Sequence, residues 1–382
     1  MSERAHELLA KLVGLPRDEP GPALGQSLAE IIRSLGFEPR VDEFGNVSAE
    51  AGQGEPAGRP VGEPRLLFIS YQGSGPVGDA ALWTASPSGE LKGEVFYGRG
   101  ACHTAGSAAA ALLAASSVAG KVEAGSLTLG FTGLGSNMFA KEQQDAVVPF
   151  VRSLKADFAV AAKPTALKIA NRQLGRARFV VRFPGQSLRG GFVSGGPALE
   201  SMFELVALLR QRQASRGDQK GAGGVTVRAV RGCDMPDIES SNCALVVERA
   251  LEFEGEEDAA RKETQNLFAV VAERNPLFEA ELIAPYLAFP STLVSETEPA
   301  VRKLASACRE VLGHCYFERQ VFSGPEGWLR ESGIPVVAFG PGDPATARLP
   351  DEHVSLQDID KAAAILEKFA IAFLSRAADA SA

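Results

Sequence analysis

Histidine is scarce in this chain of 382 residues, which contains only His6, His103, His314 and His353. Imidazole is a common zinc ligand in hydrolases, so this scarcity weighs against a metal enzyme. Cysteine is nearly as rare, and none of the five cysteines forms a Cys-x-x-Cys pair, so a structural zinc site has no support. An odd number of widely spaced cysteines instead predicts free thiols and a cytoplasmic location.

Long apolar runs and an excess of positive charge are also missing. No run of about 18 apolar residues occurs, so we expect no transmembrane helix and no membrane partner. The start MSERAHELLAKLVG lacks the pattern of a signal peptide. The formal net charge of −8 makes nucleic acid an unexpected partner. The chain is 45% hydrophobic and 23% charged, which is ordinary for a globular protein of two domains, or of one domain with an insertion.

Strands and helices alternate along the first part of the chain. Apolar runs at 65–70, 126–132 and 157–162 predict buried strands. Helical spacing of apolar residues at 24–35 and an alanine-rich stretch at 105–118 predict helices between them. This alternation favours an α/β fold with a mostly parallel sheet flanked by helices.

The pattern changes after Gly175. Residues 176–183 alternate between arginines and apolar side chains, which predicts a strand with one wet face. A helix, two strands and a second helix are expected to follow, which indicates a smaller α+β domain inserted into the larger one. We place the inserted domain at residues 175–285, and the larger, discontinuous domain at residues 1–174 and 286–382.

Two stretches carry a resemblance to a known family. Residues 66–107 read LLFISYQGSGPVGDAALWTASPSGELKGEVFYGRGACHTAGS, and residues 324–354 read GPEGWLRESGIPVVAFGPGDPATARLPDEHV. Both resemble the di-zinc amide hydrolases that include acetylornithine deacetylase, succinyl-diaminopimelate desuccinylase and glutamate carboxypeptidase. The resemblance covers nearly the whole chain and implies a zinc-exopeptidase-like fold whose inserted domain serves as a dimerisation domain or lid.

The metal-binding positions of that family are changed in the first half of the chain. Its first His ligand corresponds to Tyr71, whose phenol ionises only near pH ~10 and is a poor zinc ligand. The Asp that orients this His corresponds to Gly73. The bridging Asp corresponds to His103, which can bind one zinc ion but cannot bridge two. The Glu-Glu pair that supplies the general base corresponds to Gly135 and Ser136, so no base stands there.

The later positions carry positive charge. The resemblance places Lys163 at the next acidic ligand and Arg348 at the last zinc-binding His. Arg189 corresponds to the substrate-polarising His of the inserted domain, and Glu326 to an Asp near the substrate. Cations at two ligand positions would repel divalent ions in a partly desolvated pocket. The resemblance therefore implies a site with no metal ligand, no catalytic residue and no cofactor.

Two functions remain open, besides a third interpretation as a purely structural partner protein. The first is a catalytically inactive pseudoenzyme that binds a small anion, such as an acylated amino acid, or regulates an active relative. Its site would consist of Tyr71, His103, Ser136, Lys163, Arg189, Glu326 and Arg348. The cations could instead be neutral drift, with their side chains extending to solvent. The alternative function is an active N-acyl amino acid deacylase or peptidase with a rearranged or metal-free site. The resemblance also implies a homodimer, formed through the edge strand and helix of the inserted domain.

Overall fold

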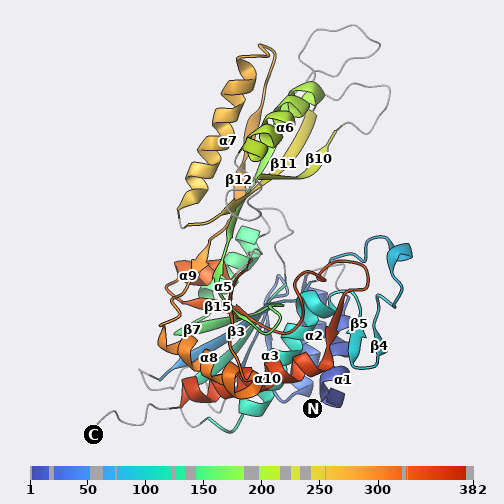
Figure 1. The fold of residues 1–382 in the computed structure, drawn as a ribbon, viewed down its shortest axis with the longest axis vertical. Helices are drawn as coiled ribbons and strands as arrows, with labels where there is room; N and C mark the ends of the chain where they lie inside the picture. The colour runs from blue at the N-terminus through green and yellow to red at the C-terminus, as the bar shows by residue number, and fades with distance from the viewer. Residues whose placement is uncertain are drawn as a thin grey trace.

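A computed structural model describes most of the chain, and Figure 1 shows its fold. The described residues are 2–16, 21–51, 63–73, 75–122, 125–133, 143–184, 198–215, 225–232, 242–253, 255–320, 324 and 326–375. Two main sheets lie one above the other along the longest axis of the molecule, and each has its own helices (Figure 1).

The larger sheet has a parallel centre. Its strands run in the order β1 (Arg40–Val41), β2 (Val47–Ala51), β6 (Ser126–Thr132), β3 (Arg65–Tyr71), β7 (Phe158–Ala162), β15 (Val336–Phe339), β8 (Ile169–Gln173) and β13 (Thr292–Leu293), with β14 (Phe317–Gln320) beside β8. Strands β6, β3, β7 and β15 are parallel to their neighbours within this group. The parallel strands therefore end at one edge, where binding sites of open α/β sheets form.

Helices cover both faces of this sheet. One face packs against α1 (Ser2–Val13), α2 (Pro22–Ser34), α3 (Gly106–Val118), α8 (Pro299–Leu312) and α10 (Leu356–Leu374). The other packs against η4 (Gln143–Val147), α5 (Val148–Ser153) and α9 (Gly327–Glu331). The hydroxyl of Ser355 caps α10 by accepting a hydrogen bond from the main-chain N–H of Asp358 at 3.4 Å. The predicted fold class, a mostly parallel sheet flanked by helices, is confirmed.

Short elements lie beside the larger sheet. The helical turn η2 (Ala80–Leu82) precedes a small antiparallel sheet of β4 (Glu90–Lys92), β5 (Val95–Tyr97) and β16 (His353–Ser355). A wide helical turn, η3 (Ala101–Ala105), leads directly into α3. By length and composition, Ala101–Val118 could span a membrane, but 83% of it is buried inside the protein, as expected of a core helix.

The smaller sheet is antiparallel. It consists of β10 (Val225–Arg231), β11 (Asn242–Leu251), β9 (Gly175–Pro184) and β12 (Glu281–Phe289), and one face packs against α6 (Ala198–Ser215) and α7 (Glu256–Ala272). The predicted alternation of β9 is confirmed, since its apolar side chains at 177, 179, 181 and 183 are all fully buried. Strand β12 continues in this sheet to Phe289, beyond the expected boundary at residue 285. The domain boundaries themselves stay a prediction.

Candidate functional site

Two of the predicted site residues lie at the ends of neighbouring parallel strands. Tyr71 is the last residue of β3, and Lys163 follows the last residue of β7. The register between these strands pairs Ile69 with Ala161, so continuing it by two residues places Tyr71 beside Lys163. The fold therefore brings together positions that lie 92 residues apart in the sequence.

Tyr71 and Gly73 depend on each other sterically. A Cβ atom at position 73 would overlap the phenol oxygen and the ring of Tyr71. The tyrosine ring thus fills the space that a side chain at position 73 would need. Its other neighbour is His103, whose ring centroid lies 6.2 Å away in an edge-to-face arrangement. The phenol in this structure is a packed aromatic ring at a strand end.

His103 accepts a hydrogen bond from Arg348. The Arg348 Nε atom donates to His103 Nε2 over 3.1 Å. A guanidinium group can only donate, so Nε2 must be unprotonated, and the proton of a neutral ring is then on Nδ1. The lone pair of Nε2 is engaged by the guanidinium, and this nitrogen is therefore not available to a metal ion in this arrangement.

The buried carboxylate of Glu352 holds the main chain around His103 and Arg348. Glu352 is fully buried, and its two oxygens accept hydrogen bonds from the main-chain N–H groups of Gly100, His103 and Arg348 at 3.0, 2.6 and 3.2 Å. Arg99 forms an ion pair with it at 3.4 Å. The sequence motifs gave no prediction of this role for Glu352.

Arg348 sits in an unusual setting. Its φ angle is 67°, in the left-handed region that residues other than glycine seldom adopt. Burial lowers the pKa of its guanidinium, and the charges of Arg99 and Arg176 lower it further, whereas Tyr71 and Glu352 raise it. The guanidinium group of Arg348 is therefore buried near two other guanidinium groups, those of Arg99 and Arg176.

Lys163 and Glu326 form an ion pair. The Lys163 ammonium donates to the Glu326 carboxylate, and the two side chains are 19% and 5% exposed. The main chain at Gly324 lies against this pair, since a Cβ there would come 2.8 Å from Lys163 Nζ. The negative charge of Glu326 is thereby neutralised by the positive charge of Lys163.

Cys102 offers no nucleophile to this site. It is fully buried, and its Sγ donates to the carbonyl oxygen of Asp343 at 3.2 Å. Burial raises the pKa of the thiol to about 12, so it stays protonated near pH 7. Gly342 has a φ angle of 86°, and a Cβ there would lie 2.8 Å from this sulfur. The close approach explains why glycine stands at this point of the Gly-Pro-Gly turn.

The residues present do not fit a pair of zinc ions. In the part of the chain that the structure describes, no group of three or more His, Cys, Asp or Glu side chains could hold a metal. His103 is bonded to Arg348 and Glu326 to Lys163. Three predicted positions, Gly135, Ser136 and Arg189, lie outside the described residues, and by sequence none of them is a carboxylate or imidazole.

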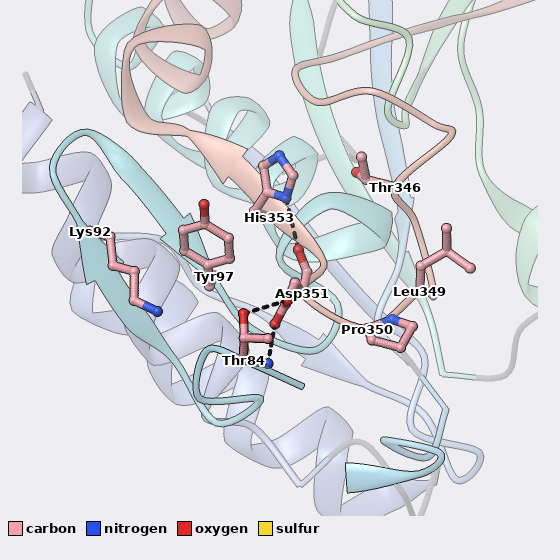
Figure 2. A pocket seen from close by; sticks show the side chains of 8 residues that line it. All are labelled: Thr84, Lys92, Tyr97, Thr346, Leu349, Pro350, Asp351 and His353. Carbon is pink, nitrogen blue, oxygen red and sulfur yellow. Dashed lines mark hydrogen bonds between the residues drawn. The ribbon is translucent and has the colours of Figure 1, made fainter. Parts of the chain in front are cut away.

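A separate cavity of about 340 Å³ shares the turn that contains Arg348 (Figure 2). It is lined by Thr84, Lys92, Tyr97, Thr346, Leu349, Pro350, Asp351 and His353. The Asp351 carboxylate accepts hydrogen bonds from the main chain and hydroxyl of Thr84, at 2.8 and 2.7 Å, and from Ala85 at 2.9 Å. These bonds fix residues 346–353 against residues 84–85 and so help to position Arg348.

Comparisons with known proteins agree with the sequence motifs. A sequence profile of peptidase family M20/M25/M40 matches residues 76–372. Succinyl-diaminopimelate desuccinylase of Caulobacter vibrioides is 30% identical over 170 residues, which cover 43% of this chain and only 41% of that protein. The uncharacterized protein YgeY of Escherichia coli is 24% identical over 374 residues, covering 91% of this chain and 89% of YgeY.

Solved structures share the fold over nearly the full length. The M20 metallo-carboxypeptidase Sso-CP2 of Sulfolobus solfataricus has a TM-score of 0.73 at 16% identity, covering 97% of this chain and 98% of that one. Human carnosine dipeptidase 1 has a TM-score of 0.74 at 15% identity, covering 98% and 96%. At these identities the likeness establishes the architecture, and the chemistry has to be judged from the residues of the site.

Proposed function

The chain belongs to peptidase family M20/M25/M40, as its motifs predicted, and we propose that it is a catalytically inactive member that binds a small anion in place of zinc. The observation that carries this proposal is the pairing of Arg348 with His103, at two positions that hold metal ligands in the family the motifs resemble. The Lys163–Glu326 pair supports it from the neighbouring strand end.

Electrostatics supports the loss of metal. A zinc ion at this site would face the ammonium of Lys163 and the guanidinium of Arg348, both largely removed from water. Two like charges about 4 Å apart repel by roughly 4 kcal/mol or more for each unit of charge product near a protein surface. Breaking the Lys163–Glu326 pair to free the carboxylate would add the cost of leaving a buried charge alone.

Arg348 supports the binding of an anion. Its contact with His103 is to a neutral imidazole, so this hydrogen bond leaves the positive charge of the guanidinium in place. A guanidinium group recognises carboxylates through two parallel hydrogen bonds. An acylated amino acid would offer such a carboxylate, and it resembles the compounds that relatives are named for processing.

The anion proposal is tested by titration calorimetry with N-acetylglycine. We expect binding to the wild-type protein, and binding about tenfold weaker or worse for Arg348→Met, which keeps an unbranched side chain but removes the charge. The matched control is Arg302→Met, because Arg302 is exposed on α8. Equal affinities for all three proteins would contradict the proposed role of Arg348.

The loss of catalysis is tested by a hydrolysis assay. Purified protein with added zinc should release no free amine from N-acetyl or N-succinyl amino acids above the uncatalysed rate. Release that requires the protein, and that Arg348→Met reduces but Arg302→Met does not, would instead support the alternative of an active amide hydrolase with a rearranged site.

A homodimer is the partner that the smaller sheet suits best. Phe203 on α6 is 58% exposed and Val230 on the edge strand β10 is 51% exposed, which leaves large apolar side chains in water in a single chain. A second copy of this chain in the cytoplasm would cover them. Sedimentation should show a dimer, and Phe203→Asp should shift it towards the monomer.

A further inference from the structure

Three arginines surround one glutamate on the polar face of the smaller sheet. Arg176 and Arg178 lie on β9, on the face opposite its buried apolar side chains. Glu248 on β11 pairs directly with Arg178 in the strand register. Ion pairs join Glu248 to Arg178 at 2.7 Å, to Arg176 at 3.3 Å and to Arg228 on β10 at 3.9 Å.

This cluster is short of negative charge. Three guanidinium groups share one carboxylate, so two positive charges are in excess within the described part of the sheet. Arg176 and Arg178 are only 15% and 12% exposed, so water compensates their charge poorly. Burial lowers the pKa of Arg176, and the charges of Arg178 and Arg228 act in the same direction against the opposing effect of Glu248. Buried charges are normally paired, so among the described residues this cluster has fewer anions than its cations require.

The cluster lies at the edge of the candidate site. Arg176 pairs with Phe289 in the register of β9 and β12. The next residue, Pro290, touches Gly327, since a Cβ at Gly327 would lie 2.6 Å from its carbonyl oxygen. Gly327 follows Glu326, the partner of Lys163. Electrostatic repulsion between Arg176 and Arg348 is consistent with the same placement.

We propose that the ligand is a small dianion that bridges the two sheets, with one negative charge on Arg348 and the other on Arg176 and Arg178. This inference rests on the proposed anion site at Arg348 and adds a second binding position at Arg176 and Arg178. One negative charge at Arg348 would leave the excess on the smaller sheet uncompensated, whereas a ligand with two charges neutralises both sides. Dicarboxylates and phosphate monoesters share this chemistry.

The wild-type protein gives the first test. Succinate and butyrate have the same number of carbon atoms but differ by one carboxylate. Calorimetry should show that succinate binds at least about tenfold more tightly than butyrate at the same ionic strength. Inorganic phosphate in a parallel titration shows whether one compact dianion satisfies the site or two separated charges are needed.

Variants on β9 and β11 give the second test. Arg176→Met should weaken succinate about tenfold while butyrate changes less than about twofold. Glu248→Gln removes the competing carboxylate and should tighten succinate. Arg182→Met is the matched control, because Arg182 lies on the same face of β9, is 49% exposed and pairs with Glu281. Circular dichroism confirms that each variant is folded.

The outcomes separate this inference from the function it rests on. Equal affinity of the wild-type protein for succinate and butyrate would overturn the proposal that the ligand is a dianion. Succinate binding that Arg348→Met abolishes but Arg176→Met leaves unchanged would also overturn it, while the proposed anion site would stand. The absence of binding by all three ligands would overturn both.

Discussion

At the scale of single residues, the described positions of the candidate site contact one another in pairs. The Tyr71 ring fills the space at Gly73, Arg348 donates to His103, and Lys163 neutralises Glu326. Restoring one ligand alone would therefore break a contact as well as create one.

The Lys163–Glu326 pair allows a direct test at this scale. Lys163→Met leaves Glu326 buried without its partner and should lower the free energy of unfolding by about 3 kcal/mol, measured by denaturant titration. The double variant Lys163→Met/Glu326→Leu should lose clearly less than the two single variants together. Additive losses would show that the two side chains do not interact.

Cys102 predicts a dependence of stability on pH. Its pKa is raised from 9.0 to about 12, so the folded state favours the protonated thiol. The resulting stabilisation is complete below pH 9.0 and is lost as the pH rises towards about 12.

The matching measurement compares the wild type with Cys102→Ala in urea across that range. Each pKa unit is worth about 1.4 kcal/mol, so a few kcal/mol is the upper bound. The stability advantage of the wild type should shrink as the pH rises from 9.0. A constant difference would mean that the thiol ionises normally in the folded protein.

The sequence could single out positions of the candidate site but not the contacts between their side chains. Tyr71, His103, Lys163 and Arg348 were identified from motifs that need no gaps. Their pairing was not predictable, because Arg348 and His103 lie 245 residues apart and the direction of a side chain depends on the folded backbone. The anion-site interpretation assumed that Lys163 was available, and its ion pair with Glu326 limits that contribution.

Among the elements, the turn at residues 346–353 matters most for the site. Arg348 and Asp351 both have positive φ angles, 67° and 55°, a backbone conformation that is uncommon for arginine and better tolerated by aspartate. Glu352 holds the turn from inside, and Asp351 holds it from outside through Thr84 and Ala85. The direction of Arg348 therefore depends on both carboxylates.

Asp351 provides the test of this turn. Its pKa is lowered below 3.8, mainly by the hydrogen bond from the Thr84 hydroxyl, so its stabilisation is present above pH 3.8 and is lost as the pH falls further. Asp351→Ala should be less stable than wild type near neutral pH and should approach it in acid. It should also weaken N-acetylglycine binding. Unchanged binding would show that Arg348 does not depend on this support.

Long periodic elements were predictable from sequence, and short or interrupted ones were not. The predicted strand at residues 126–132 matches β6 residue for residue. Strand β12 was missed because Pro285 interrupts its apolar run, and the register shifts between Ile283 and Leu287. The three-residue strands β4, β5 and β16 were missed because so short a run gives no periodic signal.

At the scale of the whole molecule, two sheets present positive charge to each other. The turn beside the larger sheet contributes Arg348, and the polar face of the smaller sheet contributes Arg176 and Arg178. The net charge of the chain is nevertheless −8, so this concentration is local. A small anion would be drawn to it against the overall field.

Zinc content tests this account most directly. Protein dialysed against excess Zn²⁺, and then against metal-free buffer, should retain far less than one zinc ion per chain by elemental mass spectrometry. Its melting temperature should not change with zinc or with EDTA. Retention of about two zinc ions per chain, as a di-zinc site requires, together with a loss of stability in EDTA, would contradict the account.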